Sequence, residues 1–213
     1  MLRTALLSIC LALAGYGSAA WLTHNFQVWT AEGARRLEVA LAPVATPVGQ
    51  VDGPGMARQP LAQWLADGQS VTLLNFVYTR CETVCLALGS VYQQLQATLQ
   101  AARKTDASAH QVRLLSISFD GQHDSPQRLQ DYAARLGADA AVWRFARVPD
   151  AQENRHLLAA FQVVVVPDGR GDFEHNAALL VVDQRGRLVR IFDVAEQQLA
   201  LDYARYLAGR SEP

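Results

Sequence analysis

The sequence contains few cysteines, a single lysine and no cluster of basic residues. Its 213 residues include three cysteines, Lys104 is the one lysine, and the formal net charge is −1 at pH 7. Proteins that bind nucleic acid neutralise phosphates with a basic patch, so this composition excludes nucleic acid as an expected partner. Internal repeats and low-complexity tracts are also absent, while 50% of the residues are hydrophobic. A chain of this length and composition can bury a full core, which argues against disorder.

Charge is also absent from the apolar stretch Ala5–Leu22, which follows Arg3 near the N-terminus. About 18 apolar residues come close to the length that crosses a bilayer. We predict an uncleaved signal anchor over residues 1–22, with Trp21 and Trp29 at the membrane interface. The single positive charge ahead of the anchor predicts a protein of the inner (cytoplasmic) membrane whose domain faces the periplasm. A cleaved export signal is the alternative.

Beyond the apolar stretch, the pattern predicts a linker over residues 23–46 and a domain over residues 47–213. Strands that alternate with helices and end in an antiparallel hairpin indicate the α/β class. A cysteine pair at the first strand-to-helix turn adds the prediction of a thioredoxin-like fold, a central mixed sheet flanked by helices. The expected strands are Val71–Tyr78, Gln111–Phe119, Val142–Ala146, Ala177–Val182 and Leu188–Phe192, after a short hairpin within residues 48–69. The expected helices are Ala31–Leu41, Leu61–Leu65, Leu86–Arg103, Pro126–Leu136, Ala151–Phe161 and Glu196–Ala208.

Two of the three cysteines lie in the stretch TRCETVC, at the junction of an expected strand and an expected helix. The start of a helix favours a thiolate over a thiol, and both Cys81 and Cys85 lie there. Their spacing places both sulfurs on one helix face, where they could form a redox disulfide or bind one metal ion. A structural disulfide is a third reading, although so short a loop contributes little stability. The remaining Cys10 is expected to serve as an apolar side chain.

A metal site needs a third ligand, and histidine is the first residue type to consider. His24, His110 and His156 are expected at the surface, whereas His123 and His175 fall at the sheet edge that carries the cysteines. His175 reaches that edge if the strand after it runs antiparallel to the others. Two thiolates and an imidazole suit Cu(I), and three ligands are too few for a closed structural zinc site. An ordinary surface or core histidine remains the alternative.

Four motifs in chain order carry a family resemblance. FVYTRCETVC, LLSISFDGQHDSPQRLQDYAARLGAD, WRFARV and ALLVVDQRGRLVRIF, the last preceded by a histidine, resemble the SCO/SenC proteins of cytochrome c oxidase assembly over about Val48–Phe192. Such proteins are membrane-anchored, thioredoxin-like and bind copper. The resemblance implies that Cys81, Cys85 and His175 are the copper ligands and that Asp120 lies near the site.

The chain departs from the family pattern at three positions. The family usually has a proline after each cysteine, and this chain has Glu82 and Leu86 instead. The two replacements restore backbone N–H donors beside the sulfurs and add a carboxylate, so we expect copper affinity and redox potential to differ from those of a typical member. Asp120 is followed by Gly121, where the family often has proline.

The resemblance implies a copper metallochaperone that delivers copper to a subunit of cytochrome c oxidase, or to another cuproprotein, and is served by a periplasmic copper donor or thiol reductant. This would not be a classical enzyme. The alternative is a membrane-anchored thiol–disulfide reductase in which Cys81 attacks and Cys85 resolves. A general thioredoxin would be expected to have a C-x-x-C pair and a proline before strand Ala177–Val182, where this chain has His175.

Overall fold

The computed structural model describes residues 2–81, 84–169 and 173–210, and for residues 84–87 it describes the backbone alone. The helices are α1 (Leu2–Leu22), α2 (Ala31–Leu41), α3 (Leu61–Leu65), α4 (Val84–Ala102), α5 (Pro126–Arg135), α6 (Ala151–Ala160) and α7 (Gln197–Ala208), with short 3-10 turns at Ala107–Gln111 and Val194–Glu196. The strands are β1 (Val44–Ala45), β2 (Gln50–Gly53), β3 (Met56–Pro60), β4 (Val71–Val77), β5 (Val112–Ser118), β6 (Trp143–Arg147), β7 (Val165–Pro167), β8 (Phe173–His175), β9 (Leu179–Val182) and β10 (Arg187–Phe192).

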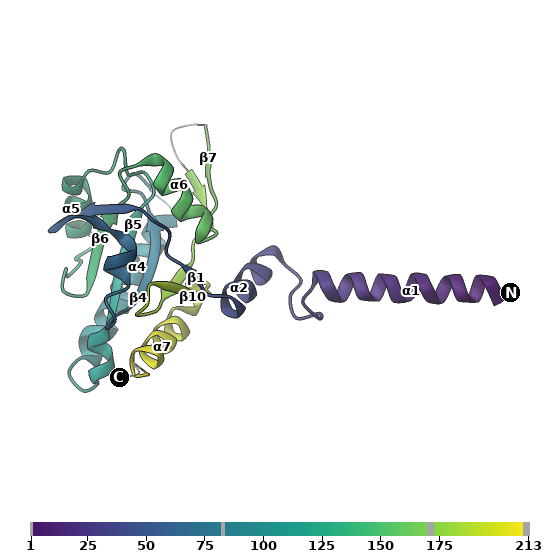
Figure 1. The fold of residues 1–213 in the computed structure, drawn as a ribbon. Coiled ribbons are helices and arrows are strands. Elements are labelled where there is room, and N and C mark those ends of the chain that lie inside the picture. Colours follow the sequence, from purple (N-terminus) through teal and green to yellow (C-terminus); the bar gives the residue numbers. More distant parts are fainter. Residues whose placement is uncertain (1, 82–83, 170–172, 211–213) are drawn as a thin grey trace.

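One mixed sheet runs through the domain (Figure 1). Its strand order is β1-β10-β9-β4-β5-β6-β2-β3. Strands β4, β5 and β6 are parallel, as expected for strands that are joined by helices. Strand β9 runs antiparallel to β4 and pairs with β10 in the predicted hairpin. Strands β2 and β3 form the predicted short hairpin. The prediction of an α/β domain with a central mixed sheet is confirmed.

Both faces of this sheet are buried under helices. Along β4, Leu74 and Phe76 belong to a buried cluster that also holds side chains of α2, α3 and α6. Val71 and Leu73 point the other way, into a second cluster with α4, α5 and α7. A strand that is covered on both sides is apolar along nearly its whole length, which explains why VTLLNFV shows no regular alternation of apolar and polar residues.

Three segments of the chain meet at one edge of the sheet. The parallel strands β4 and β5 both end there, at the pair Val77 and Ser118. The antiparallel strand β9 begins at the same edge, because Leu180 lies opposite Leu74. The segment before β9 forms a separate two-stranded sheet of β7 and β8, which the sequence did not predict.

The N-terminal elements differ in how they relate to the domain (Figure 1). Helix α1 projects away from it, buries none of its 21 residues and is long and apolar enough to cross a membrane. Helix α2 packs against the domain through Val39, which is completely buried, and β1 pairs with β10. The segment that we predicted as a linker therefore contains two elements that contact the domain.

Local signals located the helix starts well. The Ser125 hydroxyl accepts a hydrogen bond from the Arg128 N–H at 3.3 Å, and Pro126 occupies the first turn of α5, as predicted. Helices α2 and α3 have the predicted bounds, whereas α4 begins at Val84 rather than Leu86.

Candidate metal centre

The first predicted ligand, Cys81, lies in the turn that follows β4. Its backbone N–H donates to the Tyr78 carbonyl at 3.3 Å, and the residue is only 8% exposed. Because α4 begins at Val84, Cys85 falls in its first turn, but the Cys85 side chain lies outside the described part of the chain. Glu82 lies outside it as well. The pairing of the two sulfurs stays a prediction.

The second predicted site element, His175, is the last residue of β8, where it pairs with Val165 of β7. Its ring packs edge-on against Phe119, with 5.3 Å between the ring centroids. Both ring nitrogens are shielded from solvent, and neither has a hydrogen-bond partner within the part of the chain that the structure describes. Burial lowers the pKa of His175, which favours the neutral imidazole that binds metals.

An aromatic cluster of Tyr78, Phe119, Phe173 and His175 joins this histidine to the cysteine turn. Tyr78 lies 5.1 Å from Phe119 and 5.3 Å from Phe173, measured between ring centroids. The Tyr78 hydroxyl donates to the Phe173 carbonyl and accepts from the Phe173 N–H, both at 3.3 Å. Strand β8 is thus hydrogen-bonded to Tyr78, three residues before Cys81. Tyr78, Phe119 and Cys81 belong to one buried cluster, and Phe173 packs against it. The structure brings Cys81 and His175 to the same edge of the sheet.

The predicted neighbour of the site, Asp120, lies in the loop after β5. Its carboxylate forms an ion pair with Arg80 at 2.7 Å, and its N–H donates to the Ser118 hydroxyl at 3.1 Å. Because Arg80 immediately precedes Cys81, this ion pair connects the two loops beside the candidate centre. Asp120 therefore lies beside the cysteine turn, and its role near a metal site stays a prediction.

A residue that the sequence analysis missed, Asp124, holds the cysteine turn in place. Its side chain is fully buried. Its carboxylate accepts hydrogen bonds from the Thr79 N–H at 2.9 Å, the Thr79 hydroxyl at 2.6 Å and the Ser118 hydroxyl at 2.6 Å. His123 Nδ1 lies 3.0 Å from Oδ1 of this carboxylate, the oxygen that also accepts from the Thr79 hydroxyl. An aspartate directly before the Ser125 helix cap was the only local signal of this role.

The loop after β5 also contains a competing group of potential metal ligands. Within the described ranges, Asp120, His123 and Asp124 form the one such group, with ligand atoms within 4.8 Å of one another. Both carboxylates are already engaged, Asp120 by Arg80 and Asp124 by Thr79. We interpret this group as the scaffold of the loop. His110 and His156 are exposed, as expected.

The position after Asp120 requires glycine for a steric reason. A Cβ atom at Gly121 would lie 2.1 Å from the Val148 carbonyl oxygen, a distance that no real contact allows. The Gly121 carbonyl accepts a hydrogen bond from Arg147 at 2.9 Å, which fixes the close approach. This chain could not accommodate proline there without moving the loop that carries Asp120.

A mixed sheet with helices on both faces, and a cysteine turn and a half-buried histidine at the same edge of that sheet, define a thioredoxin-like protein with a candidate metal centre. The chain belongs to the SCO1/SenC family, whose model matches residues 62–207. It is 27% identical over 128 residues to the SCO1 protein homolog of Bacillus subtilis, an alignment that covers 59% of this chain and 63% of that protein. The match thus spans less than two thirds of that relative.

Solved structures of the family share the fold. A SCO1/SenC family lipoprotein from Bacillus anthracis superposes with a TM-score of 0.67 at 18% identity, covering 78% of this chain and 98% of that one. BsSco, a member of the Sco family of cytochrome c oxidase assembly proteins, gives a TM-score of 0.66 at 20% identity, with 79% and 96% covered. Copper-bound ScoI of Bradyrhizobium japonicum gives 0.60 at 20% identity, with 76% and 99% covered.

Proposed function

We propose that this chain binds copper through Cys81, Cys85 and His175 and delivers it to cytochrome c oxidase or a related cuproenzyme during assembly. Family membership supports this proposal, since ScoI of Bradyrhizobium japonicum has been solved with copper bound and BsSco belongs to a family of cytochrome c oxidase assembly proteins. The single observation that carries it is the His175 ring, whose two nitrogens are buried without a partner in the described ranges. Buried polar atoms are rarely left unpaired, and a bound metal ion would satisfy one of these nitrogens.

The donor set fits copper as a cargo. Thiolates are soft ligands that select Cu(I), and the neutral imidazole that burial favours at His175 completes a three-ligand site. A cargo site differs from a closed structural site in having few ligands, which leaves room for a ligand of the acceptor protein. The Asp120–Arg80 ion pair would hold the cysteine turn while copper enters and leaves.

The reductase alternative has weaker support. A cysteine that attacks a partner's disulfide must be reached by that disulfide, and Cys81 is only 8% exposed. Within the described ranges neither ring nitrogen of His175 has a hydrogen-bond partner through which it could pass a proton to or from an attacking thiol.

Copper titration of the reduced full-length chain in detergent tests the function. We expect about one copper ion per chain, because two cysteines and one histidine define a single site. The ion should then pass to a reduced oxidase subunit that has an empty copper site. The oxidised chain is the control and should bind none, because the ligands are thiolates. If the reduced chain bound no copper but exchanged disulfides with a partner, the reductase function would replace this one.

We also propose that α1 anchors the protein in the inner membrane with the domain in the periplasm. The uncharged, unburied helix Leu2–Leu22 supports this proposal. After cell fractionation the chain should stay with the membranes through a carbonate wash, and protease added to spheroplasts should digest the domain. Recovery of the whole protein in the soluble periplasm would contradict the anchor. Protection from external protease would contradict the orientation.

A further inference from the structure

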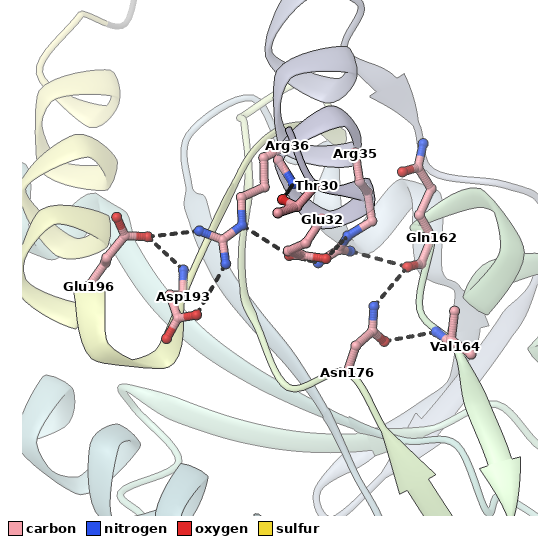
Figure 2. A network of polar contacts seen from close by, with 10 residues as sticks. Thr30, Glu32, Arg35, Arg36, Gln162, Val164, Asn176, Asp193 and Glu196 are labelled. Carbon is pink, nitrogen blue, oxygen red and sulfur yellow. Dashed lines mark hydrogen bonds and ion pairs between the residues drawn. The ribbon is translucent and has the colours of Figure 1, made fainter. Parts of the chain in front are cut away.

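The helix after the membrane anchor segment carries a buried arginine whose charge is paired locally. Arg35 of α2 is 9% exposed, and its guanidinium donates to both oxygens of Glu32, from Nε at 2.8 Å and from Nη2 at 2.6 Å. Its Nη1 points away from this pair and donates to the Gln162 carbonyl at 3.1 Å, a contact across 127 positions of sequence (Figure 2). The arginine thus connects α2 to the end of α6.

Gln162 occupies an unusual backbone position. Its φ of 54° lies in the left-handed region, where glycine is the usual residue. Its N–H donates to the Ala159 carbonyl at 3.1 Å and the Val163 N–H donates to the Leu158 carbonyl at 2.8 Å, which is the pattern of a Schellman end to α6. The Gln162 carbonyl takes no part in that pattern, so it is available to partners outside the helix.

The second partner of this carbonyl is Asn176, the residue directly after His175. Its Nδ2 donates to the Gln162 carbonyl at 3.3 Å, and its Oδ1 accepts from the Val164 N–H at 2.8 Å (Figure 2). The Asn176 N–H donates to the Val164 carbonyl at 3.3 Å. Asn176 therefore joins the two strands of the hairpin at its base, next to the pair of Val165 and His175.

We propose that Arg35 is a positioning residue of the copper site. Together with the Gln162 carbonyl and the Asn176 side chain, it fixes the base of the β7–β8 hairpin and so the place of the His175 imidazole. This inference rests on the proposed function, in which His175 is a copper ligand. It also gives α2 a role beyond that of a spacer, because the helix that follows the anchor segment supports the histidine from outside the hairpin.

The neighbouring arginine provides a matched control. Arg36 donates to the same Glu32 at 2.9 Å, but its other contacts go to Asp193 and Glu196, both at 3.2 Å, at the 3-10 turn that precedes α7. Figure 2 shows the two arginines reaching in opposite directions from one helix. Arg35→Gln and Arg36→Gln each remove one charge and the side chain's hydrogen bonding to Glu32, two bonds for Arg35 and one for Arg36. Only Arg35→Gln breaks the contact to the Gln162 carbonyl beside the hairpin.

The experiment measures Cu(I) affinity by competition with a chelator, on full-length reduced chains in detergent. Arg35→Gln should weaken affinity by about 10-fold or more, the usual loss for a residue that orients a metal ligand. It should also shift the sulfur-to-copper charge-transfer band and speed amide exchange at Val164. Arg36→Gln should leave the copper affinity, the charge-transfer band and the exchange at Val164 unchanged. Arg35→Lys can still donate to the Gln162 carbonyl and should recover part of the lost affinity. Asn176→Ala removes the side chain that joins the hairpin base to the Gln162 carbonyl and keeps the Arg35–Glu32 pair. It replaces Arg35→Gln as the test variant if Arg35→Gln fails to fold.

Equal copper affinities for the Arg35→Gln and Arg36→Gln chains would overturn the inference and leave the proposed function standing. Faster exchange at Val164 with unchanged copper affinity would overturn it too, because the hairpin base would then not position the ligand. If the unaltered chain bound no copper, the proposed function would fail and the inference would fail with it.

Discussion

Replacing His175 with alanine is expected to weaken copper binding by at least about a hundredfold, the upper end of the loss seen for residues that merely support a metal ligand. The reason is that His175 would supply one of three bonds to the ion and has no other partner for either ring nitrogen within the described ranges. The apo chain should change in unfolding free energy by at most about 1 kcal/mol, since the substitution also removes two unsatisfied buried nitrogens. Chelator competition and thermal melting of the apo chain measure the two effects.

The control for this substitution is His123→Ala. His123 lies near the same edge but contacts Asp124 through Nδ1 at 3.0 Å, so it has a structural partner already. Its replacement should leave copper stoichiometry and the charge-transfer spectrum unchanged. If His123→Ala abolished copper binding and His175→Ala did not, the ligand set would have to be redrawn around the loop of Asp120 and Asp124.

The elements of the main sheet could be predicted because their signals are local. The run VTLLNFV is buried at every position and apolar at all but Thr72 and Asn75, since both faces of β4 are covered. Ser125 with Pro126 marks the start of α5 within two residues. The direction of β9, which brings His175 to the edge of the cysteines, followed from the final hairpin. Sequence reasoning therefore reached the correct edge of the sheet.

The supports of the site could not be predicted, because they join residues far apart in the chain. Strand β8 is held against β4 by Tyr78 and Phe173, which are separated by 95 positions. The sequence pattern predicts Arg35 as a surface charge of an amphipathic helix, because its contact with Gln162 has no local signal. Gln162 itself adopts a positive φ, a conformation that sequence patterns predict only where the residue is glycine. Each of these contacts depends on how the elements pack together, which leaves no local pattern.

The largest loss of stability is expected at Asp124, the buried carboxylate that ties the cysteine turn to the loop after β5. Asp124→Ala leaves the N–H and hydroxyl of Thr79 and the hydroxyl of Ser118 without an acceptor. Breaking a buried charged network of this kind costs about 3 kcal/mol or more. For a chain of this length that corresponds to a melting temperature lower by about 6 to 12 °C.

Thermal melting of the full-length chain, followed by circular dichroism in detergent, measures this effect, and Asp131→Asn is its control. Asp131 is exposed on α5 and accepts one hydrogen bond, from Gln127 at 3.3 Å, so its replacement should leave the melting temperature unchanged. The melting temperature of Asp124→Asn should lie between those of Asp124→Ala and Asp131→Asn, because one amide oxygen can still accept from Thr79 or Ser118. Copper affinity should fall in the same order, since Thr79 lies two residues before Cys81 and a loosened turn misplaces the thiolate. A melting temperature for Asp124→Ala equal to that of Asp131→Asn would mean that the turn is held by the Arg80–Asp120 ion pair instead.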